Sequence, residues 1–249
     1  MAIIWTITAA YRNTSAAEAF ASLEAAFAAD GQYVTGDPIS RVIKNQIADQ
    51  VFYIKTYTAG GKRLRRWVGR SRPRTEWENL HFFQQLGIPT SPLVAYGQET
   101  RGGIFRRAAL VTAELKNTLD LNSLHLANHP ILADRQWITT VSRQIAGYTR
   151  RLHRNCFGHL DLKWRNILVT LSSPPQVYFI DCPAGRIRRG PGSRRWFIKD
   201  LACLDKVAKK RLTRTQRLRF FMDYAEILRL TPGDKDYVRR ILRFFGGRD

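Results

Sequence analysis

The sequence has few cysteines, and no two of them are spaced as a recognisable site. Cys156, Cys182 and Cys203 are odd in number and scattered, with no Cys-x-x-Cys pair. This pattern excludes both a disulfide framework and a zinc site. We expect the three thiols to be reduced, and Cys182 to be a small residue packed beneath a site.

Long apolar runs are also missing. No stretch approaches the roughly 18 to 20 uninterrupted apolar residues that a membrane helix needs, and the first residues lack the basic segment of a signal peptide. We therefore expect a cytoplasmic protein that does not span a bilayer. Its 249 residues, 44% of them hydrophobic, are sufficient for the core of one or two domains.

Acidic side chains are scarce. The chain has 41 Lys and Arg against 20 Asp and Glu, a net charge of +21. Seven of the basic residues lie in residues 62–74, five are arginines between Arg186 and Arg195, and residues 186–249 hold 19 basic and 7 acidic side chains, a net of +12. Such a field attracts nucleic acid, anionic lipid head groups or phosphorylated glycans, while the alternative is a solvated basic surface without a dedicated partner.

The chemistry is concentrated in residues 158–181, GHLDLKWRNILVTLSSPPQVYFID. His159, Asp161 and Asn166 form a His-x-Asp-x-x-x-x-Asn element, and a second apolar run ends in Asp181. In a phosphoryl transferase, one carboxylate accepts the proton of the attacking hydroxyl, while an Asn amide and a second carboxylate bind Mg²⁺ that bridges the nucleotide phosphates. The residue types and their order predict this chemistry.

A simpler interpretation of the same stretch is a β-hairpin, with strands at 167–171 and 176–180, whose polar residues only cap its ends. The coincidence of His-Asp, Lys163, Asn166 and a hydrophobic-Asp end at kinase spacing favours the catalytic interpretation.

Two residues upstream complete a kinase set. Lys55 closes an apolar strand, Phe52-Tyr53-Ile54-Lys55, where a kinase needs a lysine to hold the α- and β-phosphates and to pair with a helix glutamate. In the helical pattern that follows, Leu80 and Phe83 recur four and seven residues after Glu76. We therefore predict Glu76 as the partner of Lys55, with Glu78 as the second choice.

Thr112 to Leu115, including Glu114, end an apolar strand, and we expect this segment to offer backbone groups to adenine. Two elements of protein kinases are missing. No Gly-x-Gly-x-x-Gly precedes Lys55, and Asp181 is followed by Cys-Pro rather than Phe-Gly, with no Ala-Pro-Glu element after it. A phosphorylation-switched activation loop is therefore not expected.

Periodic patterns predict the remaining elements. Residues 1–30 are expected to form an N-terminal extension, with a strand at 3–8 and a helix capped by Thr14 or Ser15 that runs to about Ala29. Further strands are expected at 39–46, 51–57, 91–97 and 107–115, and helices at 75–86, 119–126, 134–154, 197–210, 213–230 and 234–245, the last two capped by Thr213 and Asp234.

Several of these segments carry a family resemblance. FYIKTY, TEWENLHFFQQLGIPTSPLVAYG, ALVTAEL, RLHRNCFGHLDLKWRNILV and VYFIDCPAGR together resemble the lipopolysaccharide core kinase family, the Kdo and heptose kinases of Gram-negative bacteria. The similarity covers roughly residues 35–210, and its motifs are shared with protein kinases and aminoglycoside phosphotransferases.

The resemblance implies an α+β, two-lobed protein-kinase-like fold, with an N-terminal lobe at 31–115 and a mostly helical C-terminal lobe with basic helices at 116–249. It implies transfer of the ATP γ-phosphate to an inner-core sugar hydroxyl at the cytoplasmic face of the inner membrane. In the nucleotide site that the resemblance implies, Lys55 binds phosphate, Glu76 positions Lys55, and Asn166 and Asp181 bind magnesium. At the acceptor, the resemblance implies that Asp161 is the catalytic base and that Lys163 neutralises the transferring phosphoryl group. His159 is implied to support the loop that carries Asp161. Asp200 is expected either to anchor the catalytic loop or only to cap a helix.

Two other functions remain open at this point. One is a kinase that acts on proteins or on small molecules of the aminoglycoside type. The other is a non-catalytic protein with a kinase-like fold that binds a polyanion, for which the retained Asp161, Asn166 and Asp181 have no use. The expected partners are an anionic glycolipid substrate and a peripheral contact with the inner membrane, rather than nucleic acid.

Overall fold

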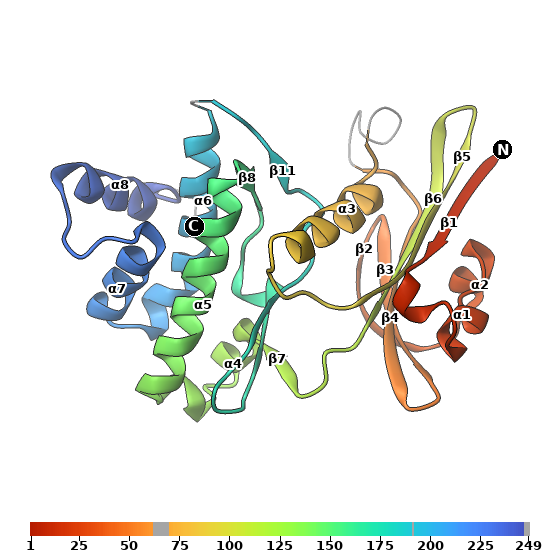
Figure 1. Ribbon diagram of the computed structural model, residues 1–249, viewed down its shortest axis with the longest axis horizontal. Helices are drawn as coiled ribbons and strands as arrows, with labels where there is room; N and C mark the ends of the chain where they lie inside the picture. The colour runs from red at the N-terminus through yellow and green to blue at the C-terminus, as the bar shows by residue number, and fades with distance from the viewer. Residues whose placement is uncertain (62–69, 191, 247–249) are drawn as a thin grey trace. The chain divides into compact units, whose positions relative to one another are not determined.

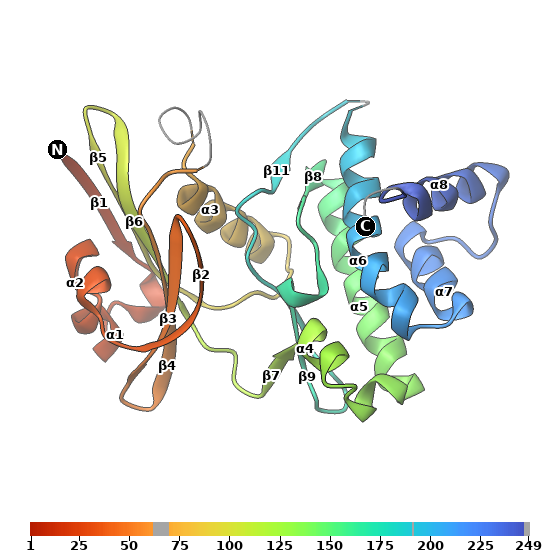
Figure 2. The same cartoon turned by 180° about the vertical axis from the view of Figure 1, so that it is seen from behind.

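The computed structural model describes residues 1–61, 70–190 and 192–246. The chain divides into an N-terminal unit, Met1–Phe82 with Ser91–Lys116, and a C-terminal unit, Phe83–Thr90 with Asn117–Asp249. The two opposite views in Figures 1 and 2 label their elements. Residues 62–69, most of the expected basic loop, lie outside the described residues.

The N-terminal unit is built on an antiparallel sheet of six strands in the order β1-β5-β6-β4-β3-β2. The expected strands are present, with small shifts of their ends, and β2 is one that the sequence patterns missed. The bounds are β1 (Ala2–Ile7), β2 (Gln32–Asp37), β3 (Ser40–Ile47), β4 (Gln50–Tyr57), β5 (Leu93–Arg101) and β6 (Ile104–Ala113).

The expected single helix up to Ala29 is wrong. The structure has two short helices, α1 (Ser15–Ala19) and α2 (Leu23–Ala28), after a 3-10 turn at Ala9–Tyr11. Ser22 starts the second helix, because its hydroxyl accepts a hydrogen bond from the Ala25 N–H at 3.1 Å. Both helices cover one face of the sheet, where Phe20 and Leu23 belong to the same buried cluster as Phe52.

The first strand is part of the sheet. β1 pairs with β5, with Trp5 opposite Gly97, and the Trp5 indole N–H donates to the Phe20 carbonyl at 2.9 Å. Residues 1–30 therefore belong to the N-terminal unit together with the strands that follow them. Glycine at position 97 has a packing reason, because a Cβ there would collide with the Ile4 carbonyl and the Trp5 ring.

Strand β4 presents opposite faces to different helices. Its side chains alternate across the sheet, so that Phe52 and Ile54 enter the cluster beneath α1 and α2. Lys55 instead meets Glu76 of α3 (Arg72–Gln85), which lies on the other face. The alternation of the strand thus places the core residues on one face of the sheet and Lys55 on the other.

The C-terminal unit is mainly helical. Its helices are α4 (Leu121–Leu126), α5 (Arg135–Arg154), α6 (Ser193–Arg211), α7 (Arg214–Ala225) and α8 (Pro232–Arg243), with 3-10 turns at Pro130–Ala133 and Trp164–Asn166. Two small antiparallel sheets accompany them, β10-β9-β7 and β11-β8. Their strands are β7 (Thr118–Asp120), β8 (Phe157–Gly158), β9 (Ile167–Thr170), β10 (Val177–Phe179) and β11 (Arg186–Ile187).

The predicted cap at Thr213 is confirmed, since Thr213 and Gln216 form a capping box at the start of α7. The predicted cap at Asp234 is wrong by three residues. Thr231 caps α8, Pro232 occupies its first turn, and Asp234 is the partner that accepts from the Thr231 N–H at 2.9 Å. α7 also ends earlier than predicted, at Ala225, because Glu226 adopts a left-handed conformation with φ of 55°.

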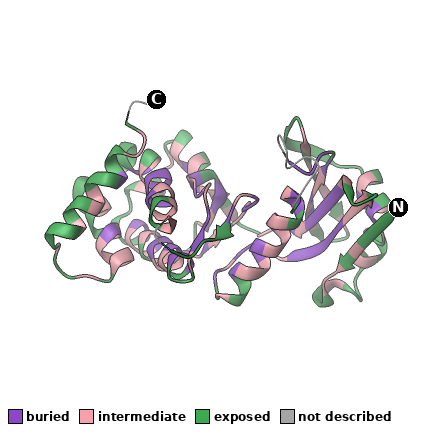
Figure 3. Cartoon of the chain, turned by 90° about the horizontal axis from the view of Figure 1, so that it is seen from above, coloured by how far each residue is buried: buried purple, intermediate pink, exposed green. Residues whose placement is uncertain are grey.

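A buried cluster between α6, α7 and α8 contains Leu201, Phe221 and Ile241. Figure 3 shows buried residues along the inner strands and helices and mostly exposed ones on the helices nearest the C-terminus. None of the helices in the described ranges combines the length and the apolar composition that crossing a membrane would require.

A pair of glycine substitutions tests this packing. We expect Gly97→Ala to lower the free energy of unfolding by about 1–3 kcal/mol, because the new methyl group forces β1 away from β5. Gly147, inside α5, has no atom within 4 Å of an added Cβ. Gly147→Ala should therefore raise the free energy of unfolding by about 0.5–1 kcal/mol. Urea unfolding followed by circular dichroism measures both; equal effects of the two substitutions would contradict the close approach at Gly97.

Candidate active site

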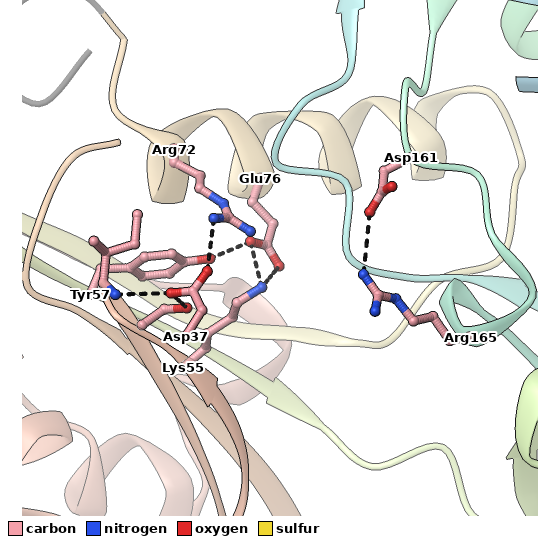
Figure 4. A network of polar contacts seen from close by, with 9 residues as sticks. Asp37, Lys55, Tyr57, Arg72, Glu76, Asp161 and Arg165 are labelled. Carbon is pink, nitrogen blue, oxygen red and sulfur yellow. Dashed lines mark hydrogen bonds and ion pairs between the residues drawn. The ribbon is translucent and has the colours of Figure 1, made fainter. Parts of the chain in front are cut away.

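The predicted partner of Lys55 is confirmed as a contact. The ammonium group of Lys55 lies 3.0 Å from Oε1 and 2.9 Å from Oε2 of Glu76, and the buried Tyr57 hydroxyl donates to the same carboxylate. The two ion-pairing side chains are only 16% and 4% exposed. Glu78, the second choice, instead pairs with Arg74 at 2.9 Å. Figure 4 shows the Lys55 network.

A buried ion pair of this kind holds a lysine in one position. Both oxygens of Glu76 contact the ammonium group, so the Lys55 side chain has little rotational freedom. An ammonium group that is fixed on one face of a sheet is suited to bind phosphate oxygens as a point charge. The phosphate-binding role of Lys55 stays a prediction.

The turn between β2 and β3 precedes Lys55, in the part of the chain where protein kinases have a glycine-rich loop. Asp37 accepts hydrogen bonds from the Ile39 N–H at 3.0 Å and from the Ser40 hydroxyl at 2.9 Å. The guanidinium of Arg72, at the start of α3, pairs with Asp37 at 3.1 Å. Burial raises the pKa of the Asp37 carboxyl, but these hydrogen bonds and the Arg72 charge outweigh it and lower the pKa below its usual value. The turn is thus stabilised by side chains rather than by glycines.

The expected adenine segment is only partly available. The Glu114 N–H donates to the Val51 carbonyl at 2.8 Å, so it continues the sheet. The Glu114 carboxylate binds Lys44 at 2.8 Å and the Tyr53 hydroxyl at 3.2 Å. Thr112 lies inside β6, and Leu115 follows its end. The Glu114 N–H is therefore not available to a base.

In the C-terminal unit, Asp161 lies among basic side chains. Its carboxylate pairs with Lys163 at 2.5 Å and with Arg165 at 3.8 Å, the second contact drawn in Figure 4. The loop behind it is fixed by the buried Trp164, whose indole N–H donates to the Leu204 carbonyl at 3.0 Å. Asp161 is 29% exposed and Lys163 is 45% exposed, so a substrate can reach both.

Asn166 and Asp181 are brought to the same end of a hairpin. The Ile180 N–H donates to the Asn166 carbonyl at 3.0 Å, and Asp181 is the next residue. The hairpin interpretation of the sequence is thus correct as structure, with strands β9 and β10, and it serves to position these two side chains. Asp181 itself has a left-handed backbone, with φ of 55°, which turns the chain immediately after β10.

Asn166 and Asp181 carry the oxygen atoms that a magnesium ion prefers as ligands. The Asn166 amide nitrogen donates to the Asp161 carbonyl at 2.8 Å, which leaves its oxygen as the atom for a metal. Within the described ranges, no three His, Cys, Asp or Glu side chains gather as a metal cluster. Mg²⁺ usually takes one or two protein oxygens and completes its shell with water and substrate phosphates.

His159 does not reach the substrate side of the loop. It is fully buried, both ring nitrogens lack a hydrogen-bond partner among the described residues, and its ring lies 5.8 Å from Phe83 and 6.4 Å from Phe179, centroid to centroid. Burial lowers its pKa, although the nearby Asp200, Asp161 and Asp181 oppose the shift. A neutral, apolar packing role fits the predicted support of the loop, and direct catalysis does not fit.

Asp200 anchors the loop that carries Asp161. Its completely buried carboxylate accepts hydrogen bonds from the N–H groups of His159 and Leu160, both at 2.7 Å. His153 lies 3.3 Å from the same carboxylate. The alternative of a simple helix cap is wrong, because Asp200 lies inside α6 rather than at its start. Leu160 needs this support, since its φ of 66° is left-handed.

Tyr57, Asp37 and Arg72 are site residues that the sequence patterns did not indicate. Tyr57 had a signal in the alternation of β4, since it is two residues after Lys55 and faces the same side. The Asp37–Arg72 pair had none, because a separation of 35 residues leaves no periodic trace.

Comparison with known proteins identifies the family. The model of the lipopolysaccharide kinase (Kdo/WaaP) family matches residues 32–224, which is most of the chain. The chain belongs to this family. The expected resemblance is confirmed, and the expected enzyme class, a phosphotransferase with an alcohol group as acceptor, is that of the family.

Two individual relatives agree. The chain is 28% identical over 182 residues to the lipopolysaccharide core heptose(I) kinase WaaP of Pseudomonas aeruginosa, covering 67% of this chain and 66% of that protein. It thus spans about two thirds of that relative's length. A solved structure, WaaP in complex with acyl carrier protein, has 22% sequence identity and a TM-score of 0.72, and the similarity covers 98% of this chain and 100% of that one. The expected α+β, protein-kinase-like fold is confirmed.

Substitutions at Asp200 test the anchoring. Asp200→Asn keeps one acceptor oxygen but presents an amide to the second N–H, and should cost about 1–3 kcal/mol of unfolding free energy. Asp200→Ala leaves both N–H groups without a partner and should cost more. Urea unfolding measures the order. Equal stability of wild type and both variants would contradict the anchoring role.

Proposed function

We propose that this chain is an ATP- and Mg²⁺-dependent kinase that transfers the γ-phosphate to a hydroxyl of a lipopolysaccharide inner-core sugar, heptose or Kdo. The observation that supports it most is the arrangement around Asp161. This accessible carboxylate has Lys163 and Arg165 beside it, and Asn166 is fixed by the Asp161 backbone, in a chain whose residues 32–224 match a sugar kinase family.

The reaction forms a bond between the acceptor oxygen and the γ-phosphorus and breaks the bond from that phosphorus to the β–γ bridging oxygen, which leaves with ADP. Asp161 accepts the proton of the acceptor hydroxyl. Lys163, which contacts Asp161 at 2.5 Å, is close enough to stabilise the negative charge of the transferring group. Positioning and charge supply most of the barrier reduction in such a reaction.

Asn166 and Asp181 are the residues that would hold magnesium, whose role is to neutralise charge on the β- and γ-phosphates. We assign nucleotide binding to Lys55, with Glu76 holding its ammonium group, and to Thr112, Glu114 and Leu115 at the end of β6. The structural argument for Lys55 is its fixed ion pair. The argument for the β6 segment is its position at the end of a strand of the same sheet.

The acceptor class follows from charge and family. A net charge of +21 favours an anionic acceptor, and the curated relative is named a core heptose(I) kinase. We therefore place the reaction at the cytoplasmic face of the inner membrane of a Gram-negative bacterium, with the basic surface as the contact to the glycolipid.

The assignment is tested by phosphate transfer from radiolabelled ATP to isolated core oligosaccharide. Asp161→Asn should lower kcat by about 10²–10⁴-fold and leave the KM for ATP nearly unchanged, because the carboxamide cannot accept the proton. Asp236→Asn is the matched control, since Asp236 is exposed on α8, and it should retain full activity.

The same assay decides between acceptors. Proteins and aminoglycosides are offered beside the oligosaccharide, and a preference for either class would replace the glycan as acceptor. Full activity of Asp161→Asn on the oligosaccharide would refute the assignment of the base. A protein that neither binds nucleotide with magnesium nor transfers phosphate would instead be a polyanion-binding member of the family.

An acyl carrier protein is a second candidate partner. One solved relative is a complex with such a protein, and the C-terminal unit contains a cavity of about 330 Å³. The cavity is lined mainly by apolar side chains of α5, α6, α7 and α8, among them Val141, Leu204, Phe221 and Ile241. We propose that it accepts the acyl chain that such a carrier presents, because an apolar cavity of this size gains free energy when a hydrocarbon replaces water.

Filling the cavity tests this partner. Ala208 lines the cavity, so Ala208→Leu should weaken binding of acylated carrier protein by about 10-fold, as expected for lost burial of part of the chain. Ala127→Leu, at an exposed position after α4, is the control. Calorimetric titration with acylated and non-acylated carrier protein measures both variants. Equal affinity of Ala208→Leu and wild type for the acylated form would exclude the cavity as the binding site.

A further inference from the structure

His153, in the last turn of α5, joins α7 to the carboxylate that anchors the loop of Asp161. Its Nδ1 lies 2.8 Å from the Tyr224 hydroxyl of α7, and its Nε2 lies 3.3 Å from Oδ2 of Asp200. The side chain of His153 is 4% exposed, and that of Asp200 is fully buried. Asp200 in turn accepts the two backbone N–H groups that directly precede Asp161. We call this series of contacts, from α7 to the loop, the Tyr224–His153–Asp200 connection.

The imidazole of His153 is held in one orientation. The Phe197 ring stacks on it at a centroid distance of 4.2 Å, and the Tyr224 ring meets it edge-on at 5.5 Å. The end of α7 is itself fastened to α5, because the Arg150 guanidinium donates to the Asp223 carbonyl at 2.7 Å. Tyr224, the next residue, is therefore kept against His153.

The distances assign the protons of the connection. A carboxylate oxygen can only accept, so the proton between His153 and Asp200 belongs to Nε2. A doubly protonated imidazole would make a charge-assisted hydrogen bond of about 2.7–2.9 Å to the carboxylate, and the observed distance of 3.3 Å is longer. The ring is therefore neutral, and its Nδ1 carries a lone pair that faces the Tyr224 hydroxyl.

The Tyr224 hydroxyl has one proton and two polar neighbours, His153 and Tyr237. Burial raises the pKa of Tyr224, so the proton stays on the hydroxyl. This proton can be donated to one acceptor at a time. Donation to Tyr237 would leave the buried Nδ1 of His153 without a hydrogen bond, which is costly in free energy. His153 is therefore the acceptor.

We propose that Tyr224 and His153 are positioning residues for Asp161. Tyr224 donates to Nδ1 of His153, and a donor at Nδ1 favours the ring proton on Nε2. The Nε2–H group then holds Oδ2 of Asp200 in the orientation that accepts the N–H groups of the loop. This inference rests on the proposed kinase activity and adds two residues that act through Asp200 rather than on a substrate. It makes the position of α7 a determinant of the catalytic rate.

Steady-state kinetics with ATP and core oligosaccharide test the connection. Tyr224→Phe removes only the hydroxyl and should lower kcat by about 5–10-fold, as expected for one lost hydrogen bond, while both KM values stay nearly constant. Tyr237→Phe is the matched control, since it removes a hydroxyl from the same partly buried cluster and leaves the donor to His153. Its kcat should equal that of the wild type. An equal fall of kcat in both variants, or no fall in Tyr224→Phe, overturns the proposal.

A double-substitution cycle separates positioning from packing. The amide nitrogen of a glutamine can replace Nε2 as the donor to Asp200, and it needs no partner to fix a tautomer. His153→Gln should therefore keep a higher kcat than His153→Ala, and adding Tyr224→Phe to His153→Gln should change kcat by less than about 2-fold. Effects of Tyr224→Phe and His153→Gln that multiply would mean that Tyr224 acts independently of His153, and they would overturn the proposal.

Failure of the proposed activity is recognised separately. Nitrogen-15 NMR of the histidine side chains reports which ring nitrogen carries the proton without any substrate, and His153→Gln identifies the His153 signals among the five histidines. The wild type should carry the proton on Nε2, and Tyr224→Phe should shift the Nδ1 signal. This result supports the connection even if the wild type transfers no phosphate. A protonated Nδ1 in the wild type, or the same Nδ1 signal in both proteins, overturns it.

Discussion

The loop that carries Asp161 depends on hydrogen bonds to the carboxylate of Asp200. It lies inside α6, completely buried, and accepts the N–H groups of two successive residues of the loop at 2.7 Å. A charged acceptor that is removed from water binds such donors strongly, and its loss would leave them without partners. The left-handed backbone of Leu160 is maintained by this contact, and Asp161 follows directly. The long helix α6 thus fixes the position of Asp161.

The N-terminal unit uses a similar principle on a sheet. The alternation of β4 sends Phe52 and Ile54 into the core and Lys55 to the opposite face, where Glu76 and Tyr57 hold it. The core positions the strand, and the strand positions the lysine. A buried charge is costly in free energy unless an opposite charge and hydrogen bonds compensate it. The buried carboxylate of Glu76 is compensated by the Lys55 ammonium group and by the Tyr57 hydroxyl.

Two short strands of the C-terminal unit support the loop that carries Asp161. β8 leads into the loop that carries Asp161 and pairs with β11, where Arg186 lies opposite Gly158. The pairing has only two residues on each strand, so its stability depends on the packing of Trp196 against Gly158.

Most residues of the candidate site could be predicted from the sequence because their chemistry is local. Asp161, Lys163, Asn166 and Asp181 stand close together along the chain, and Lys55 and Glu76 follow from the periods of a strand and a helix. The helix in residues 14–29 and the cap of α8 were predicted wrongly. Ser22 and Thr231 are the N-cap residues, and the sequence offers other residues nearby that can also cap a helix. The contacts of Asp200 and Asp37 required the tertiary structure, since hydrogen bonds between segments tens of residues apart leave no periodic pattern in the chain.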